Sequence, residues 1–127
     1  MAGYSTKPIL CLDFDGVIHT YISGWKGVDI VPDPPVPGAF EWIEKAMQHF
    51  EIHIYSSRSS DTLGRVAIAE YIKEHVPLHI ANQLIIGWQK PRAFLTIDDR
   101  CVRFDGNWSS PELNPEVLLR FKPWNKP

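Results

Sequence analysis

The chain has 127 residues, which is enough for one ordinary hydrophobic core and too few for two. Its content of 44% hydrophobic and 22% charged residues is typical of a folded domain and excludes a disordered tail or linker. The formal net charge of -2 provides no overall positive field, so nucleic acid is not indicated as a partner. We expect a single domain over residues 1–127, with a core at about 7–104 and an extension at 105–127.

The sequence also bears on location and redox state. No apolar run is long enough to cross a bilayer, and residues 1–7 lack the pattern of a signal peptide. We therefore expect a cytoplasmic protein with no membrane partner. Cys11 and Cys101 lie in apolar segments without metal-ligand spacing, which predicts two buried free thiols. Self-association is left open by the sequence.

The first predicted strand is the apolar run at residues 9–12, which ends abruptly at Asp13-Phe14-Asp15-Gly16. The following stretch, residues 17–36, is rich in glycine and proline and is predicted to be an irregular loop. Loops of this length in small domains are usually functional, so this one is a candidate lid. Apolar residues at spacings of three and four then predict a helix at 37–50.

The rest of the chain alternates between predicted strands and helices. Tryptophan side chains outside the loop are expected in core or edge packing: Trp42, Trp88, Trp108 and Trp124. The predicted elements are a strand at 51–55, a helix capped within 59–61 and running to His75, short strands at 84–86 and 94–97, an apolar run at 101–104, a short helix at 115–121 and a frayed end at 122–127. This order favours a three-layer α/β fold with a parallel sheet.

Polar residues follow three of these strands, and the carboxyl ends of parallel strands meet at one edge of a sheet. Asp13, Asp15, Asp98 and Asp99 would then gather in one crevice, where their charges repel unless a multivalent cation is bound. Ligands that are all oxygen favour a hard ion, and Mg²⁺ in particular combines few carboxylates with a substrate phosphate. The sequence therefore predicts a magnesium site, and which of Asp98 and Asp99 touches the metal stays open.

Two further residues complement this acidic cluster. Lys90 and the hydroxyl of Ser56 are a cation and a donor suited to phosphate oxygens. Gly16, Ser57 and Arg58 adjoin the same strand ends and are assigned to substrate binding. Together these residues indicate phosphoryl chemistry on a phosphorylated substrate of unknown size.

Four short motifs now resemble those of the haloacid dehalogenase-like (HAD) phosphohydrolase superfamily, in the family's order. They are Asp13-Phe14-Asp15-Gly16-Val17, Ser56, Lys90 and Asp98-Asp99. The resemblance covers residues 9 to 104 and implies a Rossmann-like three-layer sandwich with a mainly parallel central sheet. The intervals between the motifs are too short for the family's inserted caps, so we expect a capless member.

The resemblance implies a role for each motif residue. Asp13 corresponds to the nucleophile that forms an aspartyl-phosphate, and Asp15 to the general acid and base. Mg²⁺ would be held by Asp13, by the backbone carbonyl of Asp15 and by a carboxylate of Asp98 or Asp99. Ser56 and Lys90 would stabilise phosphate charge. The implied activity is Mg²⁺-dependent hydrolysis of a phosphomonoester.

Two alternatives belong to other functional classes. One is a catalytically idle HAD-like scaffold that binds a phosphorylated partner, motivated by the short chain and the missing cap. The other is a phospho-accepting receiver domain, which also combines acids, a hydroxyl and a lysine on a parallel sheet. The order of residues counts against a receiver, because Lys90 precedes Asp98 here.

Overall fold

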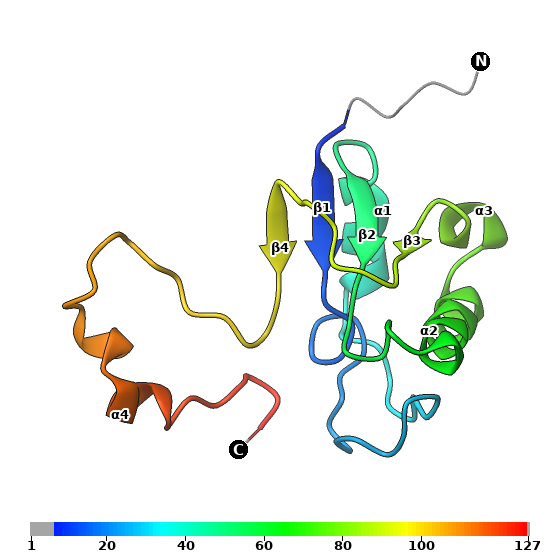
Figure 1. The fold of residues 1–127 in the computed structure, drawn as a ribbon. Coiled ribbons are helices and arrows are strands. Elements are labelled where there is room, and N and C mark those ends of the chain that lie inside the picture. Colours follow the sequence, from blue (N-terminus) through cyan, green and yellow to red (C-terminus); the bar gives the residue numbers. More distant parts are fainter. Residues whose placement is uncertain (1–6, 127) are drawn as a thin grey trace.

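The computed structural model describes residues 7–126 (Figure 1) and shows an α/β fold around a four-stranded parallel sheet. The expectation about a leader falls mainly on residues 1–6, which lie outside the described residues. The strands are β1 Ile9–Leu12, β2 Glu51–Ile54, β3 Ile85–Ile86 and β4 Leu95–Ile97. The helices are α1 Ala39–Ala46, α2 Thr62–His75, α3 Leu78–Ala81 and α4 Pro115–Leu118, with a 3₁₀ helix η1 at Pro111–Leu113.

Strand β1 is the centre of the sheet, whose order is β3-β2-β1-β4. Leu10, Cys11 and Leu12 are buried, as expected for a strand covered on both faces. β1 pairs in parallel with β2 on one side and with β4 on the other. The strand order therefore reverses at β1, and in open parallel sheets such a reversal opens a crevice outside the carboxyl ends of the strands.

The two longer helices each begin after a residue that sets their N-terminus. Helix α2 is capped as predicted, because the side chain of Asp61 accepts a hydrogen bond of 2.8 Å from the backbone N–H of Leu63. Helix α1 is shorter than the predicted 37–50, since Gly38 adopts a left-handed φ of 83° just before it. Among residues 7–126, no helix has the length and apolar character needed to span a membrane.

The two faces of the sheet are covered differently. Figure 1 shows α1 behind β1 and β2, while the connection from β3 to β4 crosses in front of them as a loop. Its last residue, Phe94, donates its backbone N–H to the carbonyl of Ile9 at 2.8 Å. In the described residues, this loop lies where a three-layer sandwich has helices. The core combines side chains of β1, β2, α1 and α2 with three from connecting segments, Phe14, Ile18 and Leu84. The members from the four elements are Leu10, Leu12, Ile43, Ala46, Ile52, Ile54, Ile68, Tyr71 and Ile72.

Beyond β4 the chain leaves the sheet as an arm (Figure 1), and several predictions about buried side chains and element bounds are wrong. The apolar run at 101–104 is an exposed coil, and Cys101, which was predicted to be buried, is exposed while Cys11 is buried. The helix predicted at 115–121 ends at Leu118. Trp108 is 80% exposed, and the other three tryptophans expected to pack (Trp42, Trp88 and Trp124) are also exposed. Hydrophobic type alone predicted burial, but here no neighbouring element in the described chain covers the arm.

Gly64 marks the closest approach of α2 to the segment that follows β2. A Cβ added at Gly64 would lie 2.0 Å from the carbonyl oxygen of Arg58, a backbone atom that cannot move alone. We predict that Gly64→Ala lowers the free energy of unfolding by about 1–3 kcal/mol through overpacking. If the glycine were unhindered, the same substitution within a helix would instead raise the free energy of unfolding by up to about 1 kcal/mol.

Urea unfolding monitored by circular dichroism measures the difference in free energy of unfolding between the parent and Gly64→Ala. Val66→Ala, at an exposed position of the same helix, is the matched control and should change stability by less than about 0.5 kcal/mol. A Gly64→Ala protein as stable as the parent would contradict the close approach.

Candidate active site

The structure brings together the polar residues that follow three different strands. Asp13 follows β1 and donates its backbone N–H to the carbonyl of Ile97, the last residue of β4, at 3.0 Å. On the other side, Tyr55 donates its backbone N–H to the carbonyl of Leu12 at 3.0 Å. These two hydrogen bonds place the ends of β1, β2 and β4 side by side. The crevice predicted from the sequence is therefore present.

Three of the four predicted metal ligands form one acidic cluster. Asp13, Asp98 and Asp99 each offer a carboxylate oxygen, and these oxygens lie within 4.8 Å of one another. Gly16 makes room for it: its φ is +84°, and an added Cβ would lie 2.2 Å from Oδ2 of Asp99. Gly16 was expected to bind substrate, and the structure shows that its missing side chain is what admits the Asp99 carboxylate.

The electrostatics of this cluster are unfavourable for three ionised carboxylates. Burial and the nearby Asp98 carboxylate raise the pKa of Asp13 to about 8, even though the backbone N–H of Phe14 donates to its Oδ1 at 2.8 Å. Burial also raises the pKa of Asp99. A divalent cation would offset this repulsion, and a set of carboxylate oxygens suits a hard ion. The donor set thus fits the predicted magnesium site.

Asp15 is held apart from this cluster by two donors. The Nε of Arg58 donates to its Oδ2 at 2.8 Å, and Nδ1 of His19 lies 2.9 Å from its Oδ1. The Asp15 side chain is therefore ion-paired within the protein, which differs from the expectation of four carboxylates around one ion. Asp15 also lines the crevice beside Asp13.

Arg58 is fully buried, although the sequence assigned it to substrate binding. Its Nη1 donates to the backbone carbonyls of Gly27 at 2.8 Å and Val28 at 2.9 Å, and its guanidinium lies 4.8 Å from the centre of the Trp25 ring. These contacts tie loop 17–36 to Asp15. They favour a positioning role for Arg58 over direct contact with a substrate.

His19, which lies in the irregular loop predicted at 17–36, is a buried partner of Asp15. Its Nε2 accepts a hydrogen bond from the backbone N–H of Asp33 at 3.0 Å, so this nitrogen carries no proton. The proton of a neutral His19 is then on Nδ1, which donates to Asp15. The spacing of four residues between Asp15 and His19 was the only sign of this pair in the sequence.

Two hollows lie on either side of Asp13. The first, here called the Lys90 hollow, has a volume of about 280 Å³ and is lined on its own side by Cys11, Tyr55, Lys90, Thr96 and Asp98. The second, the Asp15 hollow, has a volume of about 160 Å³ and is lined on its own side by Asp15, Tyr21, Asp99, Pro123, Asn125 and Lys126. Both hollows share Asp13, Ser56, Ser57 and Arg100. Each motif residue with a polar side chain therefore lines at least one hollow: Asp13, Asp15, Ser56, Lys90, Asp98 and Asp99.

The predicted phosphate ligands differ in how they are held. Ser56 is buried, and its Oγ accepts a hydrogen bond of 3.2 Å from the backbone N–H of Arg58. Its hydroxyl hydrogen remains available to an acceptor in the crevice. Lys90 is exposed and reaches the site from the β3–β4 loop, while Ser57 is exposed at the rim. A rigid hydroxyl and a mobile amine thus face the acidic cluster.

Sequence reasoning missed the contribution of residues 123–126, which were predicted to be frayed. Pro123 is buried, and the indole Nε1 of Trp124 donates to the backbone carbonyl of Gly16 at 2.7 Å. Asn125 donates from Nδ2 to the carbonyl of Thr20 at 2.8 Å. We call Pro123–Lys126 the return segment. Nothing in its short polar sequence signalled that it lies against the loop after β1.

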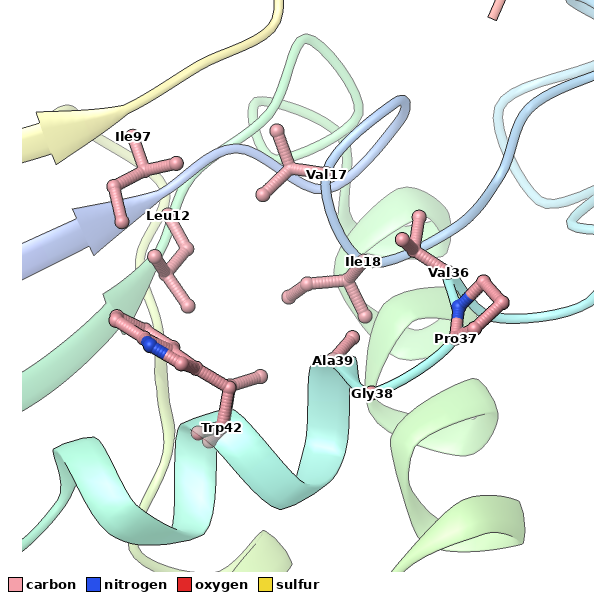
Figure 2. Close-up of a pocket in the computed structure, with 10 residues that line it drawn as sticks. Leu12, Val17, Ile18, Val36, Pro37, Gly38, Ala39, Trp42 and Ile97 are labelled. Carbon is pink, nitrogen blue, oxygen red and sulfur yellow. The ribbon is translucent and has the colours of Figure 1, made fainter.

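A separate cavity of about 320 Å³ lies between β1, β4 and α1, on the apolar side of the same loop. Figure 2 shows Leu12 and Ile97 from the strands, Val17 and Ile18 from the loop and Trp42 from α1 around it. No titratable side chain lines this cavity. It is suited to hydrophobic contact, whereas the titratable side chains of the candidate site line the polar hollows.

The raised pKa of Asp13 predicts a pH dependence of stability in metal-free protein. Between its ordinary pKa of 3.8 and about 8, the folded chain holds a proton on Asp13 that the unfolded chain has lost. The free energy of unfolding should therefore fall as pH rises through this interval. Asp13→Asn cannot titrate and should show a shallower fall, measured by urea unfolding in EDTA at pH 5 to 8.

Asp105→Asn removes an exposed carboxylate from the arm and is the control, with the parent's slope expected. Equal slopes for the parent and Asp13→Asn would show that Asp13 is ionised throughout this range.

No protein-family model, curated protein or solved structure matches the chain. The resemblance to HAD phosphohydrolases therefore rests on four short motifs. Their function is argued below from where the structure places these side chains.

Proposed function

We propose that the protein is a small, capless HAD-like phosphatase, a Mg²⁺-dependent phosphomonoester hydrolase that acts through an aspartyl-phosphate on Asp13. The observation that carries this proposal is the convergence of an acidic cluster, a separately paired carboxylate, a buried hydroxyl and a lysine on one crevice. Asp13 lies at its centre, between Lys90 on one side and Asp15 on the other. Phosphoryl transfer needs these parts: a nucleophile, a proton donor and positive charge around the phosphate.

In the first step, a carboxylate oxygen of Asp13 attacks phosphorus, and the bond from phosphorus to the leaving oxygen breaks. Asp15 enters this step in its protonated form and gives its proton to that leaving oxygen, so that an alcohol departs and Asp15 becomes the carboxylate that Arg58 and His19 stabilise. In the second step, water attacks the phosphorus of the aspartyl-phosphate, and Asp15 accepts the proton of the water. The phosphorus–oxygen bond to Asp13 breaks, which releases inorganic phosphate and restores both carboxyl groups.

Asp13 must be ionised to attack, which conflicts with its pKa of about 8 in the metal-free protein. A magnesium ion bound by Asp13, Asp98 and Asp99 would supply the positive charge that keeps these carboxylates ionised and draws a phosphate oxygen toward them. The Ser56 hydroxyl would donate to a second phosphate oxygen. Lys90 would offset the negative charge shared between Asp13 and the phosphate.

The positioning of Asp15 supports its assignment as acid and base. Arg58 and His19 hold both of its oxygens, so the carboxyl cannot rotate away from the crevice. This leaves Asp15 fixed on one side of Asp13, as proton transfer to a leaving group requires. Arg58 and His19 thus act through Asp15 as positioning residues.

We further propose that the fold is a reduced form of the Rossmann-like three-layer sandwich. Its strand order of β3-β2-β1-β4 is shared with the first half of doubly wound sheets, and the crevice lies at the reversal of strand order. The β3–β4 loop replaces a crossover helix, and Lys90 lies in this loop. Shortening the crossover would bring the lysine into the site without a longer chain.

Asp13→Asn should lower the turnover of 4-nitrophenyl phosphate with Mg²⁺ by at least about a thousandfold, because the nucleophile is lost. The release of 4-nitrophenolate measures the rate, and Asp105→Asn is again the control and should keep the parent's rate. Full activity of Asp13→Asn would remove the mechanism. A parent protein that binds phosphate esters with Mg²⁺ and never hydrolyses them would instead establish the idle scaffold.

Asp15→Asn should separate the two steps. With 4-nitrophenyl phosphate the leaving group needs little protonation, so Asp13 should still be phosphorylated, but water attack then lacks its base. We expect a burst of one 4-nitrophenolate per protein, followed by turnover about 10²–10⁴-fold slower than that of the parent. Mass spectrometry of the denatured protein should show one added phosphoryl group. A steady rate equal to the parent's, without a burst, would exclude Asp15 from both steps.

A further inference from the structure

The return segment forms the outer wall of the Asp15 hollow, far along the chain from the other lining residues. Figure 1 shows the chain leaving the sheet after β4 and coming back toward the loop that follows β1. The hydrogen bonds of Trp124 to Gly16 and of Asn125 to Thr20 fix it there, and Pro123 is buried in the contact. Asn125 and Lys126 therefore face the same hollow as Asp15.

The position of Asp15 identifies what this hollow would hold, provided the proposed function is correct. A general acid must lie beside the leaving oxygen. Asp15 lines the Asp15 hollow and is not among the residues that line the Lys90 hollow. The alcohol part of the substrate would consequently project into the Asp15 hollow, against the return segment.

The charges on this wall point to an anionic leaving group. Arg100 and Lys126 both line the hollow, and neither forms an ion pair with a carboxylate in the described part of the chain. Lys126 instead lies with its Nζ 5.7 Å from the centre of the Tyr21 ring. Asp13, Asp15 and Asp99 line the same hollow, but Asp15 is already paired with Arg58 and His19, and Asp13 and Asp99 would be engaged by the proposed metal ion. Two cations without a salt bridge among the described residues therefore favour a ligand with a negative group of its own.

The size of the hollow limits the leaving group. Its volume of about 160 Å³ corresponds to the volume of about five water molecules in the liquid. A short substituent fits this space.

From these observations we propose that the return segment is a substrate-recognition element, and that the enzyme selects phosphomonoesters whose short leaving group carries a second anionic group. Arg100 and Lys126 hold that group, whether it is a carboxylate or a second phosphate. In a site without a cap, the return segment determines the substrate specificity.

Two matched pairs of substrates test the proposal by their ratios of kcat/KM with Mg²⁺. 3-Phosphoglycerate and glycerol 3-phosphate share a carbon skeleton and differ in a terminal carboxylate, while fructose 1,6-bisphosphate and fructose 6-phosphate differ in a second phosphate. We expect the parent to prefer the more anionic member of at least one pair by about tenfold. The pair that shows the preference identifies the anionic group.

Lys126→Met and Arg100→Met should each lower that preference by about fivefold, because one charge contact is lost. Lys122→Met, which removes an exposed lysine just before the return segment, is the matched control and should keep the parent's preference. All three side chains are exposed, and circular dichroism verifies folding.

The outcomes separate the two proposals. If the parent hydrolyses 4-nitrophenyl phosphate but does not distinguish the members of either pair, or if Lys126→Met and Arg100→Met keep its preference, the inference about the return segment is wrong and the phosphatase stands. If the parent hydrolyses none of the five esters, both are wrong.

Discussion

The buried ion pair between Arg58 and Asp15 is the contact on which the rest of the site depends. One guanidinium, 0% exposed, joins the carboxylate after β1 to the segment after β2 and to two backbone carbonyls of loop 17–36. Removing one partner of such a pair leaves a buried charge without compensation, which typically costs about 3–5 kcal/mol. The pair therefore ties loop 17–36, Asp15 and the segment after β2 together.

The same ion pair divides the acidic residues into two kinds. Asp15 has its counter-charge within the protein, whereas Asp13, Asp98 and Asp99 face one another with their charges uncompensated. Burial and repulsion raise the pKa of Asp13, so its ionised form is unfavourable in a protein without a bound cation. One carboxylate is thus suited to moving protons and three to holding a metal ion, although all four belong to the same residue type.

Much of the sheet and of the acidic cluster could be predicted from the sequence because the signals are local. The apolar run at Ile9–Leu12 stops at Asp13, and the alternation of polar and apolar residues at Glu51–Ile54 stops before Ser56. The sequence therefore indicates where each strand ends and polar residues begin. The roles of Arg58 and of the return segment could not be predicted in this way. Their partners lie far away in the sequence, and a charged or aromatic side chain gives no sign of whether its neighbours will bury it. The exposed Trp108 and the buried Arg58 show this error in both directions.

The hydrogen bond from Trp124 to Gly16 spans 108 residues of sequence. This separation determines when the contact can form during synthesis. Chains emerge from the ribosome beginning at the N-terminal side, and contacts of long sequence separation form late because of their loop-closure entropy. The pairing of Arg58 with Asp15 needs only the first half of the chain. A nascent polypeptide would then form the pair proposed to handle protons well before it acquires the wall proposed to select the substrate.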